Sequence, residues 1–484
     1  MSYTWILSLI IGYFILLIIV AHLTSKKASD TAFFTGDRSS PWYVVAFGMI
    51  GASLSGVTFI SVPGWVASSQ FSYMQMVLGY LVGYAVIALI LLPLYYRLQL
   101  TSIYTYLSSR FGFWSYKTGA VFFLLSRIVG ASFRLFLVAN VLQIAVFDFL
   151  HIPYFLTVFI TIALIWVYTF RSGIKTVVWT DTLQTFFMLS ALCVTVYVLG
   201  NKLNLSLAEL STMVYKSNYA RIFFFDDVNT AHFFSKKFIA GVFMAIVMTG
   251  LDQDMMQKNL SCRNLKEAQK NMYWFSATLV IVNLLFLSLG VLLLKYYGEM
   301  NIALPKDADD IYPVLALQHL GGLGASVFIL GVIAAAYSSA DSALTSLTTS
   351  FCIDILSKPN IEKRKRYLIH FAFSIVLFFV IILFKEINDE SVIKKLFTYA
   401  GYTYGPLLGL YAFGLFTKIK VHDTLTPWIC LLMPILTFLI GYCSATFLGY
   451  TIGFELLLIN GFLTFLGLLL ISKTESNHVQ EKTV

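Results

Sequence analysis

Five polar side chains inside an otherwise apolar stretch are the residues best suited to do chemistry. The stretch reads AAAYSSADSALTSLTTS, and the five are Ser338, Asp341, Ser342, Thr345 and Ser346. Their spacing of i, i+3, i+4, i+7 and i+8 puts them on one face of a helix. Hydroxyl, carbonyl and carboxylate oxygens suit a hard cation. An acid in hydrocarbon indicates function, and a packing face with Asp341 paired to a base is the alternative.

Further charged side chains lie in or beside other apolar stretches. Asp181 lies in VVWTDTLQ, where it could bind a cation or complement a helix dipole. Arg127 and Arg134 are seven residues apart and share a helix face. Buried arginines pair with carboxylates or bind anionic ligands, and the ion pair is the interpretation we favour slightly. Asp252 and Asp254 lie near the end of a stretch, and we interpret them as interfacial.

Two apolar stretches, residues 43–63 and 238–256, are interrupted by residues that weaken a helix. The first contains AFGMIGASLSGVTFISVPG, and the second is cleanly apolar only from Phe238 to Leu251. Small and hydroxyl residues supply oxygen ligands and let neighbouring backbones approach closely. We therefore expect a break in each stretch, with close helix packing as the alternative explanation.

The composition indicates a membrane protein. Of the 484 residues, 58% are hydrophobic and 12% are charged, and the mean hydropathy is +0.80. Soluble domains carry about 25% charged residues. The net charge of +9 raises nucleic acid as a partner, but the basic residues fall in short loops between apolar stretches. Membrane topology explains that pattern better, so we expect no nucleic acid partner.

Thirteen stretches are candidates to cross a bilayer, which takes about 20 residues. They are residues 4–22, 43–63, 74–96, 117–147, 154–170, 177–199, 238–256, 272–296, 323–353, 367–385, 395–416, 425–446 and 452–472. The two interrupted stretches are five spans apart, which is typical of transporters built from inverted repeats. The repeats would be residues 43–199 and 238–416, within one transmembrane domain of residues 1–472.

The lysines and arginines predict the orientation of the spans. With the N-terminus outside, most of the 33 basic residues fall on the inner side, among them Lys26, Lys27, Arg171 and Lys258. This satisfies the positive-inside rule. The first span has no basic residue before it, unlike a signal peptide. An outer N-terminus and an inner C-terminus require an odd number of spans and make residues 473–484 a short cytoplasmic tail.

Nothing in the sequence favours an enzyme. The five cysteines have no metal-ligand spacing, and we interpret them as reduced. The apolar stretches contain no nucleophile motif and no phosphate-binding loop. A membrane sensor is an alternative of a different class, but it would need an output domain, and we expect none after residue 472.

Six segments, in order along residues 33–418, resemble the sodium/solute symporter family. They are FFTGDRSSPWY, LPLYYRLQLTSIYTYLSSRFG, RSGIKTVVWTDTLQ, DQDMMQKNLSCRNLKEA, YSSADSALTSLTTS and GPLLGLYAFGLFTK. The resemblance implies an all-α membrane protein with the LeuT-type inverted-repeat fold. It also implies sodium-driven import of a small polar organic solute, which could be a sugar, a sialic-acid-like or other carboxylate, or an amino acid. Such a protein lies in the cell membrane, contacts the lipid bilayer, and is expected to function as a monomer.

The resemblance further implies which residues hold the ions. The positions that match the family's core sodium ligands are Gly51, Leu54, Ala335, Ser338 and Ser339. The positions that match a second cation site in some relatives are Asp181, Ser338 and Ser342, and we expect Asp341 to join them. Relatives often carry a hydroxyl residue where Asp341 stands, so the number of sodium ions, one or two, stays open. Proton coupling through these carboxylates is the alternative.

The positions that match substrate contacts in relatives lie in the first interrupted stretch and the span after it. They are Ser53, Ser55 and Thr58, with Gln75 as the polar candidate from the following span. Arg134 joins them as a residue that could recognise a carboxylate. The sequence does not name the substrate.

Overall fold

The computed structural model describes residues 3–25, 32–169, 173–358, 361–387, 392–450 and 452–473, and the described residues are helical with no strand. The α-helices are α1 (Tyr3–Ser25), α2 (Ala32–Thr35), α3 (Trp42–Ser53), α4 (Gly56–Ser69), α5 (Tyr73–Val86), α6 (Leu92–Arg97), α7 (Thr105–Arg110), α8 (Phe113–Leu142), α9 (Tyr154–Thr169), α10 (Ile174–Leu203), α11 (Leu207–Lys216), α12 (Phe234–Ala245), α13 (Gln253–Leu260), α14 (Leu265–Glu299), α15 (Ile311–Gln318), α16 (Gly321–Ser350), α17 (Lys363–Ile387), α18 (Val392–Phe416), α19 (Thr426–Phe447) and α20 (Leu456–Leu470). Lys26, Lys27, Arg171 and the tail from residue 474 lie outside the described residues.

Among the described residues, eight helices are long and apolar enough to cross a membrane, and up to ten if each bent helix pair is one span. The other predicted spans fall on α9, α18 and α20, of which α9 and α20 contain shorter apolar helices. The chain is therefore a multi-span membrane protein. Thirteen crossings and the orientation stay predictions.

Both predicted breaks are confirmed. The helices α3 and α4 meet at 56°, and the pair formed by Phe234–Gly250 and α13 meets at 65°. At the first break, Leu54 and Ser55 leave the helical conformation, and Ser55 has a φ of −8° and a ψ of 174°. A helix end exposes backbone groups that have no partner within the helix. Each break therefore places polar backbone atoms at membrane depth.

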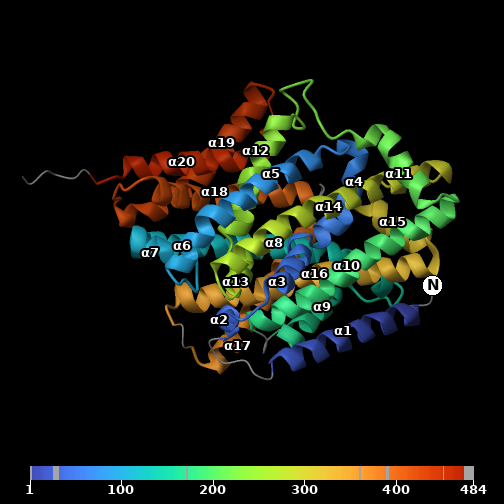
Figure 1. The fold of residues 1–484 in the computed structure, drawn as a ribbon, viewed down its shortest axis with the longest axis horizontal. Helices are drawn as coiled ribbons and strands as arrows, with labels where there is room; N and C mark the ends of the chain where they lie inside the picture. Colours follow the sequence, from blue (N-terminus) through green and yellow to red (C-terminus); the bar gives the residue numbers. More distant parts are fainter. Residues whose placement is uncertain are drawn as a thin grey trace, which may run out of the picture.

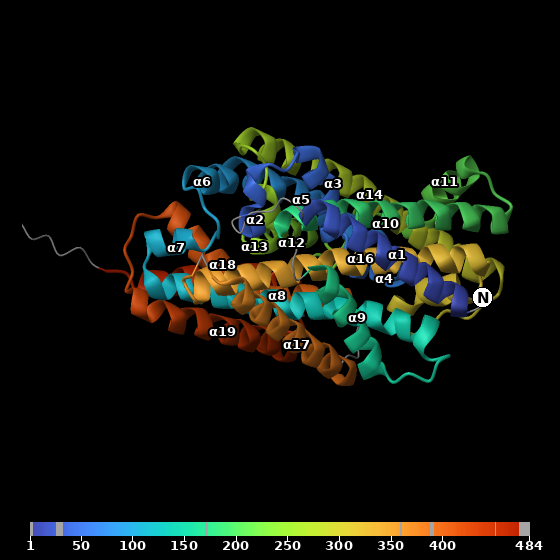
Figure 2. The same ribbon diagram turned by 90° about the horizontal axis from the view of Figure 1, so that it is seen from below.

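The helix α16 forms the centre of the bundle. In its most apolar window 83% of the residues are buried, against 28% in α1 and 22% in α19. It packs against α10 and α8, and it runs beside α8 in Figure 2. The chain begins at one end of the long axis and α20 ends at the other (Figure 1). The polar face of α16 therefore lies deep inside the protein.

Candidate functional site

The break between α3 and α4 lies directly against α16. The hydroxyl of Ser339 lies 3.5 Å from the carbonyl oxygen of Ala52 and 3.4 Å from that of Ala335, both within hydrogen-bonding reach. Because α3 ends at Ser53, the carbonyl of Gly51 belongs to the last turn and has no donor within the helix. The break therefore brings carbonyl and hydroxyl oxygens together in a buried place.

Gly51 and Ser338 complete this group of oxygens. The amide of Gly51 donates to Thr185 Oγ1 at 3.0 Å, and a Cβ added at Gly51 would collide with Thr185 and lie 3.4 Å from Ser338 Oγ. Ser338 is fully buried, and its hydroxyl has no hydrogen bond within the described residues. A buried polar group without a partner is costly. A sodium ion bound by oxygen ligands suits this place, and the five predicted core ligands lie around it or at the adjoining end of α3.

The predicted second set of ligands is also brought together, between α10 and α16. The Ser342 hydroxyl donates to Asp181 Oδ2 at 3.4 Å, and the Ser342 amide donates to Asp341 Oδ1 at 2.6 Å. Thr180 Oγ1 donates to Asp341 Oδ2 at 3.3 Å. Asp181 and Asp341 have no exposed surface. Two carboxylates and several hydroxyls thus share one small buried region.

A lysine that the sequence analysis missed lies in the same region. The Nζ atom of Lys258, on α13, is 2.7 Å from Asp181 Oδ2 and 3.9 Å from Asp254 Oδ1. Its side chain is 1% exposed. The second bent pair turns α13 into the core, so Lys258 is not an exposed loop residue, and its place on the cytoplasmic side stays a prediction. In the sequence, the i, i+4 spacing of Asp254 and Lys258 was the one pattern that indicated a contact between these two side chains.

Asp252 and Asp254 are also buried, so the interfacial interpretation is wrong. Arg127, on α8, forms an ion pair with Asp254, and its Nη1 lies 4.0 Å from Asp252 Oδ2. The hydroxyl of Tyr404, on α18, donates to Asp252. A chain of buried charges therefore runs from Asp181 through α13 to α8, and the neutral hydroxyl of Tyr404 joins it from α18. For Arg127 the expected ion pair is correct.

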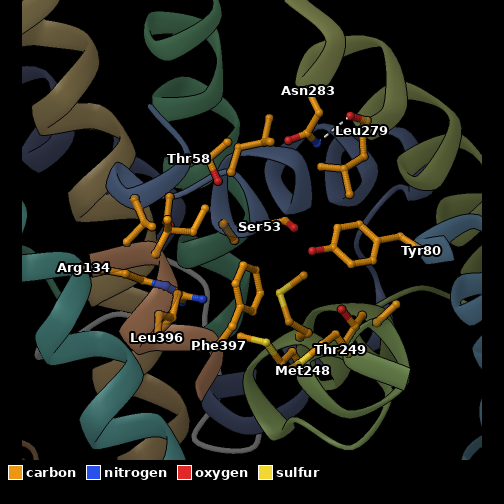
Figure 3. Close-up of a pocket in the computed structure, with 18 of the residues that line it drawn as sticks. Ser53, Thr58, Tyr80, Arg134, Met248, Thr249, Leu279, Asn283, Leu396 and Phe397 are labelled. Atoms are coloured by element: carbon orange, nitrogen blue, oxygen red, sulfur yellow. Dashed lines mark hydrogen bonds between the residues drawn. The ribbon is translucent and has the colours of Figure 1, made fainter. Parts of the chain in front are cut away.

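Arg134 differs from Arg127 although both lie on α8. It is 7% exposed, it makes no ion pair among the described residues, and its Nε atom has no hydrogen-bond partner there. Its side chain points into a cavity beside the first break (Figure 3). A buried guanidinium without a carboxylate is a strong site for a planar anion.

The cavity beside the first break has a volume of about 70 Å³. Four predicted substrate residues line it: Ser53, Ser55, Thr58 and Arg134. Polar residues that the sequence analysis missed line it as well, namely Tyr80, Thr249 and Asn283 (Figure 3). The Asn283 amide donates to the carbonyl of Leu279 at 2.8 Å, and its Oδ1 has no partner within the described residues.

Gln75 does not line this cavity. Its Nε2 donates to the carbonyls of His232 at 2.8 Å and Ser72 at 3.3 Å, and its Oε1 accepts from the amide of Phe224 at 3.2 Å. These bonds tie α5 to the segment before α12. The side chain is fully buried, and its amide group is hydrogen-bonded to backbone groups.

The broken helices, the oxygen-lined group at the break and the arginine-lined cavity are features of an ion-coupled secondary transporter. Residues 33–421 match the sodium:solute symporter family. The match covers well over half of the chain, so the chain belongs to the sodium:solute symporter family.

Curated relatives include two bacterial transporters of similar length. The sodium/sialic acid symporter NanT of Aliivibrio fischeri is 26% identical over 410 residues, which is 81% of this chain and 79% of the relative. The sodium/sialic acid symporter SiaT of Proteus mirabilis is 24% identical over 435 residues, which is 85% of this chain and 84% of the relative. The human sodium/iodide cotransporter is 24% identical over 407 residues, covering 81% of this chain and 61% of that protein.

Solved structures share the fold. A sodium-coupled sialic acid symporter in a substrate-bound outward-open state has a TM-score of 0.81 at 20% identity, covering 97% of this chain and 98% of that chain. A closed nucleobase-cation-symport-1 family transporter with bromovinylhydantoin bound has a TM-score of 0.57 at 15% identity, covering 91% and 93%. The protein is a multi-pass transporter of the cell membrane and not an enzyme, sodium is its coupling ion, and its partner is a small-molecule solute.

Proposed function

We propose that this protein imports a small carboxylate-bearing solute together with sodium by alternating access. It would do so as a monomer with thirteen spans, an outer N-terminus and two inverted repeats, residues 43–199 and 238–416. Inward movement of sodium supplies about 2.3 kcal/mol per charge for each 100 mV of membrane potential. One bundle of helices would rock against the other around a fixed central site.

The observation that carries the choice of solute is the buried guanidinium of Arg134. Arg127 is neutralised by Asp254 and Asp252, whereas Arg134 has no ion pair among the described residues and faces the cavity with Ser53, Ser55 and Thr58. A carboxylate would supply the missing partner. Sialic acid, which NanT and SiaT carry by name, bears a carboxylate and several hydroxyls. It is therefore the first solute to test.

The coupling ion would bind at the break. The ligands of this core site would be the carbonyls of Gly51, Leu54 and Ala335 and the hydroxyls of Ser338 and Ser339. An ion there joins α3 to α16 and fixes the end of α3, next to Ser53 and Ser55 in the solute cavity. Sodium and solute should therefore raise each other's affinity by the same factor.

A second cation would bind at Asp181, Ser338, Asp341 and Ser342. Lys258 already supplies one positive charge to Asp181, at 2.7 Å. The second cation would therefore be held mainly by Asp341, with its Ser342 and Thr180 partners. Sodium is our choice for this ion because hydroxyl oxygens surround the carboxylate, and a proton is the alternative because a buried carboxylate binds protons readily.

The test of the solute class compares Arg134→Gln with Arg134→Lys in purified protein. We expect sodium to increase the affinity of the wild type for sialic acid, and Arg134→Gln to weaken sodium-dependent binding about 100-fold or more, as loss of a buried charge pair does. Arg134→Lys should keep part of the affinity. An unchanged affinity in Arg134→Gln, or preferential binding of an uncharged sugar, would refute the carboxylate assignment.

A further inference from the structure

A second cavity, of about 260 Å³, lies between α4, α12, α18 and the segment that leads into α20. Its basic side chains are Lys236, Lys237 and Lys394, and its acidic side chain is Glu455. By the predicted topology all four elements meet here at the outer side of the membrane. A concave surface dominated by one sign of charge concentrates counter-ions and speeds their binding.

Lys237 is the unusual member of this cavity. Its side chain is 4% exposed, yet among the described residues it makes no ion pair, and Glu455 acts on it only at longer range. Its Nζ lies 4.8 Å from the ring centre of Trp65 and 4.6 Å from that of Phe454. Ring faces attract a cation but do not neutralise it. A buried ammonium held this way is incomplete without an anion.

Lys236 faces the same cavity from the first turn of α12. Its Nζ lies 4.2 Å from the ring centre of Tyr450, whose hydroxyl donates to Glu455 at 2.9 Å. One carboxylate oxygen of Glu455 thus accepts a hydrogen bond from a neutral hydroxyl. His232 adds no charge, because burial, and then the nearby Lys237, lower the pKa of its imidazole. Among the described side chains that line the cavity, lysines therefore outnumber carboxylates.

Four aromatic rings separate this outer cavity from the one that contains Arg134. Ring centres are 5.8 Å apart for Trp65 and Tyr73, 6.5 Å for Tyr73 and Phe397, 5.1 Å for Phe397 and Phe454, and 6.4 Å for Phe454 and Trp65. Tyr73 and Phe397 line the inner cavity, and Trp65 and Phe454 line the outer one. Each ring thus contacts two of the others, and the four rings come from α4, α5, α18 and the segment before α20. We call them the aromatic quartet.

We propose that the outer cavity is a second, weaker binding site for the carboxylate of the solute, formed by Lys236 and Lys237. The solute would dock there first and pass to Arg134 when the aromatic quartet parts. This inference rests on the anionic solute and the outer N-terminus proposed above. It adds a site that depends on lysine and not on sodium, because the outer cavity lies apart from the break that would hold the ion.

The test measures sialic acid binding to Arg134→Gln in nanodiscs of neutral phosphatidylcholine without sodium. We expect weak binding that falls with ionic strength, and a further loss of about tenfold or more when Lys237→Met is added. Lys237→Arg should retain binding, which excludes a folding defect. The matched control is Lys202→Gln, an exposed lysine at the end of α10, which should change nothing. If neither Lys236→Gln nor Lys237→Met changes the binding of sialic acid, the proposal is overturned.

A lipid headgroup offers the same anionic chemistry, so a second arm uses nanodiscs that contain phosphatidylglycerol. Lysine-dependent retention of that lipid, without lysine-dependent binding of sialic acid, would overturn the solute site. A third arm separates this inference from the proposed function by quenching Trp65 fluorescence, measured as the difference from Trp65→Phe. Iodide should quench it more than caesium does, and Lys236→Gln with Lys237→Met should abolish that preference, even if sialic acid proves not to be the transported solute. Equal quenching by both ions would overturn the anion site.

Discussion

At the scale of single residues, the sodium site depends on hydroxyl groups that have little else to bind. Ser338 Oγ has no hydrogen bond among the described residues, and the Ser339 hydroxyl makes two long contacts with carbonyl oxygens at 3.4 and 3.5 Å. By contrast, the hydroxyl of Ser346, on the same helix, donates to the carbonyl of Ala343 at 3.0 Å. A hydroxyl group that already has a hydrogen-bond partner contributes little to the binding of an ion.

We therefore expect Ser338→Ala and Ser339→Ala each to raise the sodium concentration for half-maximal transport about tenfold, since 1.4 kcal/mol corresponds to one decade. Ser346→Ala is the matched control and should leave that concentration unchanged. Titration of uptake against sodium at fixed solute makes the measurement, with expression and thermal unfolding checked alongside. The same sodium response in both Ser338→Ala and Ser339→Ala would show that the ion binds elsewhere.

The residue scale also shows where sequence reasoning succeeded and failed. The hydroxyl face of α16 was predictable because its spacing is local and periodic. The partners of Arg127 were not, since Asp254 lies 127 positions away and the pairing needs α13 to turn inward. The burial of Lys258 was not predictable, because a lysine near the end of an apolar stretch normally marks a loop. Gln75 was predicted as a substrate contact without a fixed register; its hydrogen bonds to backbone groups could not be read from the sequence, and its contact with the substrate stays a prediction.

At the scale of elements, a buried ion pair joins α10 to α13. Lys258 and Asp181 are 1% and 0% exposed, and their charged atoms are 2.7 Å apart. Removing one partner of such a pair leaves an uncompensated buried charge, which costs about 3–5 kcal/mol, whereas removing both is often nearly neutral. The bent helix pair is therefore anchored by this contact.

We expect Lys258→Met to lower the midpoint of thermal unfolding strongly and Lys258→Met with Asp181→Asn to recover most of the loss. Exposed Lys295 pairs with Glu299 at 2.9 Å on α14, and Lys295→Met should have almost no effect, because exposed pairs contribute about 0–1 kcal/mol. Unfolding of purified protein in one detergent makes the comparison. A double variant no more stable than Lys258→Met would indicate that Asp181 is not the partner that matters.

A second prediction at this scale concerns the ion between α10 and α16. If sodium binds at Asp341, the Hill coefficient for sodium exceeds one, and Asp341→Asn lowers it towards one. If a proton binds there, transport falls as external pH rises, and Asp341→Asn removes that dependence. The charge moved per solute, measured in wild type and Asp341→Asn, decides the matter. A ratio of one in both proteins, with no effect of pH, would mean that no second ion is bound.

At the scale of the whole molecule, both broken helices pack against the central helix α16. The architecture was predictable from the sequence because long apolar stretches and interrupted spans leave strong signals. The cavity could not be predicted, because its walls come from α4, α5, α8, α12, α14 and α18, and only the packed structure shows which side chains meet. In the same way, only the packed structure shows that Arg127 is paired with carboxylates and that Arg134 makes no ion pair among the described residues.

The coupling of a sodium gradient to uptake of a carboxylate-bearing solute is tested most directly by uptake of labelled sialic acid into proteoliposomes with sodium outside and potassium inside. We expect accumulation above the external concentration, stimulated by an inside-negative potential because positive charge moves inward. Arg134→Gln, or replacement of sodium by potassium, should abolish this accumulation. Equal accumulation in sodium-free buffer under a proton gradient would contradict this coupling.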